Sequence, residues 1–137
     1  MQTLTREMIN LYNIKKIKID FMGYSFKDIN DLTYHHLIIS RKDGGKRTLE
    51  NGAILTEISH EYLHLMEFIE PDIFYYITSE IIDETIKGKI NIENLKNIRE
   101  LLIKFEQKHK GEKRNKGKIL IKPKYLIRPE LDTIKLI

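Results

Sequence analysis

The chain has no cysteine and no tryptophan among its 137 residues, and only three prolines and seven glycines. Without cysteine there is no disulfide framework, no thiolate zinc site and no cysteine nucleophile. Any metal ion must therefore be held by imidazole, carboxylate or carbonyl groups. A chain of this length is expected to form one domain that buries a core without such staples.

Long hydrophobic runs and a targeting segment are also lacking. No apolar stretch approaches the roughly 18 residues of a membrane span, and Met1–Glu7 has neither the basic region nor the apolar core of a signal peptide. We expect a soluble protein of a bacterial cytoplasm or an infected host cell, with no membrane partner. Valine is absent and alanine occurs once, while isoleucine and lysine dominate. This composition is typical of AT-rich coding and favours a bacterial or phage source.

Positive charge is concentrated in one segment. Lys104–Tyr125 holds nine Lys or Arg residues and two Glu residues, a net charge of +7, whereas the whole chain carries +4. Such a segment is either a solvated extension or a surface that contacts phosphates. We therefore divide the chain into one domain at residues 1–110 and a basic C-terminal extension at residues 111–137.

The middle of the chain predicts a strand, a loop, a second strand and a helix. The strands are expected at Leu32–Ser40 and Gly52–Leu55, joined by the polar loop Arg41–Arg47. Ser59 is the expected N-cap of a helix that runs to about Glu70.

The flanking regions are expected to be mainly helical. Two packing helices are predicted at about 72–87 and 91–110, because their apolar residues recur at helical spacing. A short helix at Thr5–Tyr12 and a half-exposed strand at Ile14–Phe21 are predicted before the first central strand. Residues 111–137 carry few helix signals, so a loop with an extended tail is expected there.

Histidine is scarce but clustered, since four of the five histidines fall within thirty residues together with one asparagine. The order is His35-His36, then Asn51, then His60 and His64. Fourteen residues separate His36 from Asn51, eight separate Asn51 from His60, and three separate His60 from His64. Imidazole serves as a metal ligand or as a general base near neutral pH, so the cluster indicates one of these chemistries.

His60 and His64 lie four residues apart on the predicted helix, so both side chains occupy one helical face. Two surface histidines explain that pair equally well. A third histidine from the neighbouring hairpin would change the interpretation, because three neutral imidazoles make a site for Zn, Ni, Mn or Co.

His35 and His36 are adjacent on a predicted strand, where neighbouring side chains point to opposite faces. The two are therefore expected to have different tasks. If one binds a metal with His60 and His64, the other lies where it can take a proton from an attacking water. The alternative is a structural pair in which one histidine is buried and hydrogen-bonded.

The connection between the two strands offers two further candidates. Asn51-Gly52 is a common turn dipeptide, so Asn51 alone indicates a turn. The loop before it carries four basic side chains that either contact phosphates flanking a site or are simply solvated. These are Arg41, Lys42, Lys46 and Arg47.

The window from Leu32 to Glu67 resembles the His-Asn-His (HNH) endonuclease motif, in the spacing found in nuclease colicins. The matching pieces are Tyr34-His35-His36-Leu37-Ile38, Asp43-Gly44-Gly45, Glu50-Asn51-Gly52-Ala53-Ile54-Leu55 and Ser59-His60-Glu61-Tyr62-Leu63-His64. They cover about a quarter of the chain. Many members carry Cys pairs around a structural zinc. This chain lacks such pairs, and the colicin-type members lack them too. Ile39-Ser40 stand where a proline is often found.

The resemblance implies an α+β fold with a ββα-metal (His-Me finger) core, a short antiparallel hairpin plus a helix, surrounded by additional α-helices. By position, His35, His60 and His64 resemble the ligands of one divalent metal ion (Zn, Ni, Mn or Mg). His36 resembles the general base, and Asn51 the residue whose amide braces the hairpin and orients that base. The implied reaction is hydrolysis of DNA to a 5′ phosphate and a 3′ hydroxyl, in which the metal stabilises the phosphate and the leaving oxygen.

A rival from another class is an HNH-derived protein, for example one encoded by a phage, that binds nucleic acid or a partner protein without cutting. The helical stripe at Leu95–Phe105 and the basic extension suit that role. Other phage or bacterial proteins are then the expected partners. Sequence specificity, oligomeric state and the physiological metal are not determined by the motif, because they depend on features outside it.

Overall fold

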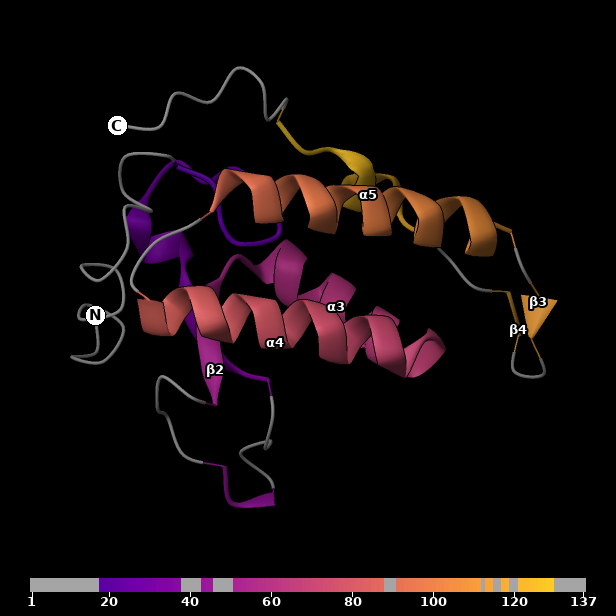
Figure 1. Cartoon of the computed structure of the whole chain (residues 1–137). Coiled ribbons are helices and arrows are strands. Elements are labelled where there is room, and N and C mark those ends of the chain that lie inside the picture. Colours follow the sequence, from indigo (N-terminus) through magenta and orange to yellow (C-terminus); the bar gives the residue numbers. More distant parts are fainter. Residues whose placement is uncertain are drawn as a thin grey trace.

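The structure is a computed structural model that describes residues 18–37, 43–45, 51–87, 91–111, 113–114, 117–118 and 121–129. Within those residues the fold is α+β. A two-stranded antiparallel hairpin is followed by three α-helices, and a second, very short hairpin comes after the last of them (Figure 1). The elements are η1 (Ile29–Asp31), β1 (Thr33–His36), β2 (Gly52–Leu55), α3 (Glu57–Ile69), α4 (Pro71–Lys87), α5 (Ile92–His109), β3 (Lys113–Arg114), β4 (Gly117–Lys118) and η3 (Pro123–Leu126).

The three helices lie close to their predicted positions. Asn91 caps α5 as expected, since its side chain accepts the amide of Asn94 at 3.3 Å. The N-cap of α3 differs from the prediction: it is Thr56, not Ser59, because Thr56 Oγ1 accepts the amide of Ser59 at 3.3 Å. Ser59 therefore lies inside the first turn. The fold places α4 and α5 side by side with α3 behind them (Figure 1).

The strand predictions are confirmed in part. β2 has the expected bounds, and β1 covers Thr33–His36 of the strand predicted at Leu32–Ser40, of which residues 38–40 lie outside the described part of the chain. The strand predicted at Ile14–Phe21 is wrong in its described part, where Ile19 forms one isolated bridge with Ser25. The chain turns there because Asp20 Oδ1 accepts the amides two and four residues later. The helix predicted at Thr5–Tyr12 lies outside the described residues.

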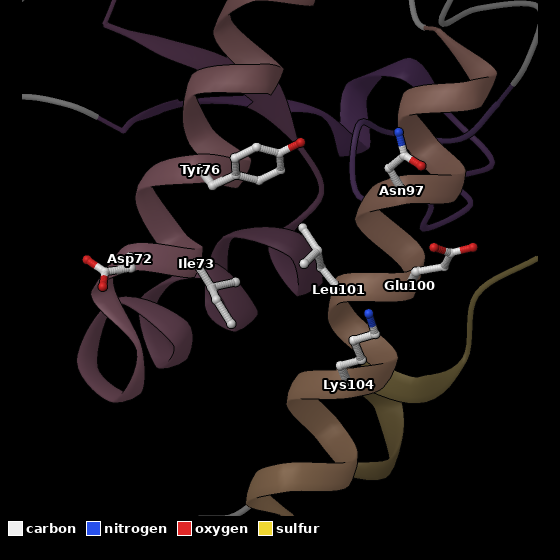
Figure 2. Close-up of a pocket in the computed structure, with 7 residues that line it drawn as sticks. All are labelled: Asp72, Ile73, Tyr76, Asn97, Glu100, Leu101 and Lys104. Atoms are coloured by element: carbon white, nitrogen blue, oxygen red, sulfur yellow. The ribbon is translucent and has the colours of Figure 1, made fainter.

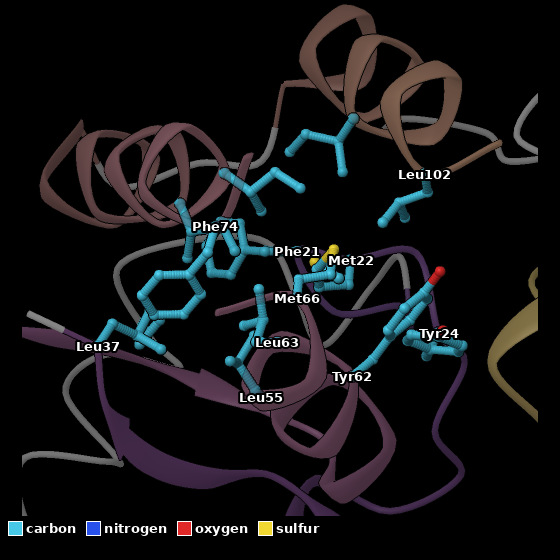
Figure 3. Packing of buried hydrophobic residues seen from close by; sticks show 14 of the residues in the cluster. Phe21, Met22, Tyr24, Leu37, Leu55, Tyr62, Leu63, Met66, Phe74 and Leu102 are labelled. Carbon is cyan, nitrogen blue, oxygen red and sulfur yellow. The ribbon is translucent and has the colours of Figure 1, made fainter. Parts of the chain in front are cut away.

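The core lies between the α4–α5 pair and the layer formed by the hairpin and α3 (Figure 3). Its fully buried side chains come from every part of the described chain, including Phe21 and Met22 before the hairpin and Leu55 on β2. Each buried side chain of this size contributes about 1.5–3 kcal/mol relative to exposure. The turn at residues 20–24, which the sequence did not predict, is therefore a structural part of the domain.

Residues 121–129 of the C-terminal extension pack on the helices. Tyr125 in η3 is buried, and its ring stacks on Tyr62 of α3 with centroids 4.5 Å apart. Tyr24 Oη donates to the Tyr125 carbonyl at 2.6 Å, and Arg128 donates to Glu106 of α5 at 2.8 Å. Residues 121–129 are thus a packed strap across α3 and α5, unlike the extended tail that was expected.

Candidate functional site

α3 carries His60 and His64 on the side opposite its core-facing residues. Tyr62, Leu63 and Met66 are buried, whereas His60 is half-buried and His64 is exposed. The Nε2 atoms of the two histidines lie 2.7 Å apart, with ring centroids separated by 4.3 Å. The predicted shared face is confirmed, and the two Nε2 atoms make a hydrogen bond with each other.

The start of α3 is fastened by Asp20, a fully buried carboxylate. Its Oδ2 accepts the Thr56 amide at 3.1 Å and the Thr56 hydroxyl at 2.7 Å, and it also accepts the Ser59 hydroxyl. Burial raises the pKa of Asp20 above its usual range, although these hydrogen bonds oppose the shift. Asp20 positions the turn of α3 that immediately precedes His60. Sequence reasoning missed it because its partners lie 36 and 39 residues away.

The hairpin pairs His35 with Ala53 and His36 with Gly52. Beyond the last pair, the Asn51 carbonyl accepts the Leu37 amide at 2.8 Å, and Asn51 is buried. A Cβ atom on Gly52 would lie 2.2 Å from the His35 carbonyl oxygen, so only glycine fits there. Asn51-Gly52 therefore lies at the end of the hairpin that carries the histidine pair, and the role of the Asn51 amide stays a prediction.

His35 lies against α3. Its ring stacks on that of His60, with centroids 3.8 Å apart and an interplanar angle of 24°. Its Nε2 makes a hydrogen bond with the Thr33 hydroxyl at 2.7 Å. Burial lowers the pKa of His35 to about 4, and the charge of His60 adds to that shift. At neutral pH this imidazole is uncharged, as a metal ligand must be.

His36 lies on the other face of β1, where its ring meets Tyr34 edge-on at a centroid distance of 5.0 Å. It also lines a small cavity of about 80 Å³ together with His60, His64 and Glu67. Its Nε2 atom is buried and makes no hydrogen bond with any described residue. Both histidines of the pair thus reach the helix, His35 by stacking and His36 through the cavity.

The donor set fits a borderline metal ion in chemistry but not yet in arrangement. The Nε2 atoms of His60 and His64 make a hydrogen bond with each other, and the His36 side chain lines the cavity that those two histidines share. His35, the expected third ligand, has its Nε2 on Thr33. Accordingly, the described residues contain no group of three or more His, Cys, Asp or Glu side chains arranged to hold a metal ion.

Glu61 separates two interpretations of the helix. The string His60-Glu61-Tyr62-Leu63-His64 also fits the His-Glu-x-x-His pattern of metallopeptidases, in which the glutamate is the general base. Here Glu61 accepts from Lys122 at 2.5 Å, Lys124 at 2.7 Å and Tyr125 Oη at 2.7 Å. These contacts, that of Lys122 above all, lower the pKa of Glu61 to about 2. Glu61 thus fastens the C-terminal strap, and its carboxylate is held by three donors of that segment.

The four basic loop candidates, Arg41, Lys42, Lys46 and Arg47, lie outside the described residues. Three lysines of the basic segment are already in ion pairs: Lys108 with Glu70 at 3.2 Å, and Lys122 and Lys124 with Glu61. Part of the charge that suggested phosphate contacts therefore stabilises the fold.

No protein-family model, curated protein or solved structure matches the chain. Among the residues that the structure describes, no helix is both long and apolar enough to cross a membrane.

Proposed function

We propose that this chain is a divalent-metal-dependent HNH endonuclease that hydrolyses DNA phosphodiester bonds, with a ββα-metal core at residues 32–67. The observation that supports it best is the meeting of four histidines from a hairpin and the helix that follows it. The His60 and His64 nitrogens are 2.7 Å apart, His35 stacks on His60, and His36 shares their cavity.

In this proposal His35, His60 and His64 hold the metal ion. When bound, a divalent cation supplies positive charge that stabilises a phosphate oxygen and the leaving oxygen. The low pKa of His35 keeps its imidazole neutral at physiological pH. His35 also needs to turn its Nε2 from Thr33, where it lies at 2.7 Å, toward the pair on α3.

His36 acts as the general base. Its buried Nε2 has no hydrogen-bond partner among the described residues, and its side chain lines a cavity of about 80 Å³, which is room for water-sized molecules. A neutral imidazole there accepts the proton of a water that attacks phosphorus. Asn51, buried at the end of the hairpin, is proposed to keep the His36 backbone in register.

A supercoiled-plasmid assay tests the function. The full chain is incubated with plasmid and with Mg, Mn, Ni or Zn in separate reactions, and nicked and linear forms are measured. We expect cleavage with at least one metal, none with a chelator, and a loss of about a hundredfold or more in His36→Ala. Absence of cleavage with every metal, or full activity of His36→Ala, contradicts the proposal.

The rival function, an HNH-derived protein that binds without cutting, is favoured by one surface feature. Phe68 at the end of α3 is 70% exposed and Tyr75 on α4 is 55% exposed, so both leave aromatic surface accessible to a partner. The same assay separates the two functions, because a binder shifts the mobility of DNA or a partner without producing nicked plasmid.

A further inference from the structure

A second cavity lies between the C-terminal half of α4 and the start of α5, on residues that the histidine site does not use. Its volume is about 290 Å³. Four carboxylates line it, together with three asparagine amides and one lysine, Lys87. The carboxylates are Glu80, Asp83, Glu84 and Glu93.

Glu84 is the buried member of this group, with 5% of its surface exposed. Its Oε1 accepts the Asn91 amide at 3.0 Å and Asn94 Nδ2 at 3.1 Å. Its Oε2 is buried and has no hydrogen-bond partner in the described part of the chain. An unpaired buried carboxylate oxygen is costly, so this atom is suited to a donor from outside the chain.

The charges around Glu84 favour a cation. Burial raises the pKa of Glu84 to about 7, and Glu80 and Asp83 on the same helix add to that shift. Glu93 contributes a further carboxylate from α5. Lys87 forms an ion pair with Asp83, its ammonium 2.8 Å from the Asp83 carboxylate, and both of those side chains are exposed.

We propose that this cavity binds a small aliphatic polyamine, with one ammonium group on Glu84 Oε2 and another on the neighbouring carboxylates. An ammonium carries three N–H donors and takes them to separate acceptors. Glu80 and Glu84 are four residues apart on α4, about 6 Å along the axis, a separation that a short methylene chain spans. A bare metal ion fits less well, because no three described carboxylate or histidine side chains converge as a metal shell.

The adjoining groove gives the methylene chain an apolar wall. Asn97 lines both the acidic cavity and this groove, which has a volume of about 370 Å³. Ile73 and Tyr76 of α4 and Leu101 of α5 extend into the space between the two helices (Figure 2). A ligand that has charged ammonium groups and apolar methylene segments therefore matches the acidic cavity and the apolar groove beside it.

Isothermal titration calorimetry with spermidine tests the proposal, on the full chain without DNA or metal at pH 7 and low salt. We expect one spermidine per chain and a dissociation constant raised about tenfold or more in Glu84→Gln. The amide of that variant keeps the oxygen to which Asn91 and Asn94 donate, so the fold is retained. Glu93→Gln is the second variant, with binding weakened severalfold. Glu57→Gln, an exposed acid on α3, is the matched control and binds as the parent does.

Three outcomes overturn the proposal. In the first, the parent does not bind spermidine; in the second, Glu84→Gln and Glu93→Gln both bind spermidine as tightly as the parent does. In the third, the parent binds CaCl₂ or MgCl₂ more tightly than spermidine, and that binding also depends on Glu84. The last result would make the cavity a metal site. None of these results depends on nuclease activity, so this inference and the proposed function can fail separately.

Discussion

The imidazole of His35 stacks on that of His60, with ring centroids 3.8 Å apart. This contact joins the hairpin to α3 at the point where the four histidines meet. It also brings together two imidazoles whose pKa values are both lowered, chiefly by burial. The rings of His35 and His60 are therefore neutral, and His60 also contacts the ring of His64. Neutral imidazoles in contact are what the metal hypothesis requires.

The first prediction concerns metal affinity. We expect His60→Ala and His64→Ala each to weaken zinc binding about tenfold or more in calorimetry, since their Nε2 atoms lie 2.7 Å apart. Unchanged affinity in both variants would remove the metal assignment.

The pair on β1 allows a sharper comparison. His35→Ala is expected to weaken zinc binding, whereas His36→Ala is expected to keep the affinity and lose cleavage. If His36→Ala loses the metal and His35→Ala does not, the two residues have exchanged roles. That outcome would agree with the cavity that His36, not His35, shares with His60 and His64.

The second prediction concerns Glu61. Glu61→Gln is expected to cleave plasmid within about twofold of the parent, because the carboxylate is bound by Lys122, Lys124 and Tyr125 and takes no proton from substrate. Its melting temperature should fall, since the strap loses its charged contact. If Glu61→Gln loses cleavage but keeps the parent's melting temperature, the prediction is wrong and Glu61 has a catalytic role.

The third prediction concerns Asp20. Asp20→Ala leaves the Thr56 amide and hydroxyl, the Ser59 hydroxyl and two further amides without their acceptor. We expect a loss of at least about 3 kcal/mol in urea unfolding. Asp28→Ala, which removes an exposed cap of η1, is the control and should cost about 1 kcal/mol. Equal losses in the two variants would contradict the anchoring role.

The positions of the helices could be predicted from the sequence, but the long-range contacts that fix them in place could not. The stripes of α4 and α5 and the cap at Asn91 are local signals, so they could be read directly. Asp20 and Glu61 act on partners 36 to 64 residues away, and no local pattern marks such contacts. The sequence predicts Ser59 as the cap because serine favours that position. The cap is Thr56, three residues earlier, whose amide and hydroxyl donate to Asp20.

In the histidine cluster too, local periodicity predicted some features, whereas tertiary packing determined others. Spacing placed His60 and His64 on one face, since helical periodicity settles that question. Strand alternation separated the environments of His35 and His36. Alternation did not predict that His35 bonds Thr33 or that His36 Nε2 has no hydrogen-bond partner among the described residues, because both depend on how the hairpin packs against α3.

The fourth prediction is a pH dependence of stability. The pKa of Glu84 is about 7 in the fold and about 4.5 in the unfolded chain, so the folded state holds the proton more tightly. Its contribution is fully present below about pH 4.5 and is lost as the pH rises through about 7. The loss amounts to at most about 3 kcal/mol.

Urea unfolding of the parent and Glu84→Gln from pH 4 to 8 measures this contribution. The difference in unfolding free energy should change in favour of the variant as the pH rises, because the introduced amide cannot ionise. Parallel curves would show that the pKa of Glu84 is the same in the folded and unfolded chain, which contradicts the prediction. Glu80, Asp83, Glu93 and Lys87 are unchanged in both proteins, so their titration largely cancels in the comparison.

The strap of residues 121–129 has a consequence for biosynthesis. Glu61 and Tyr62 lie beside the histidines of α3, but their partners Lys122, Lys124 and Tyr125 are made some sixty residues later. A nascent chain on the ribosome therefore carries every residue of the histidine site before it has the segment that secures their helix. The contacts that secure α3 therefore form only after residues 121–129 have been made.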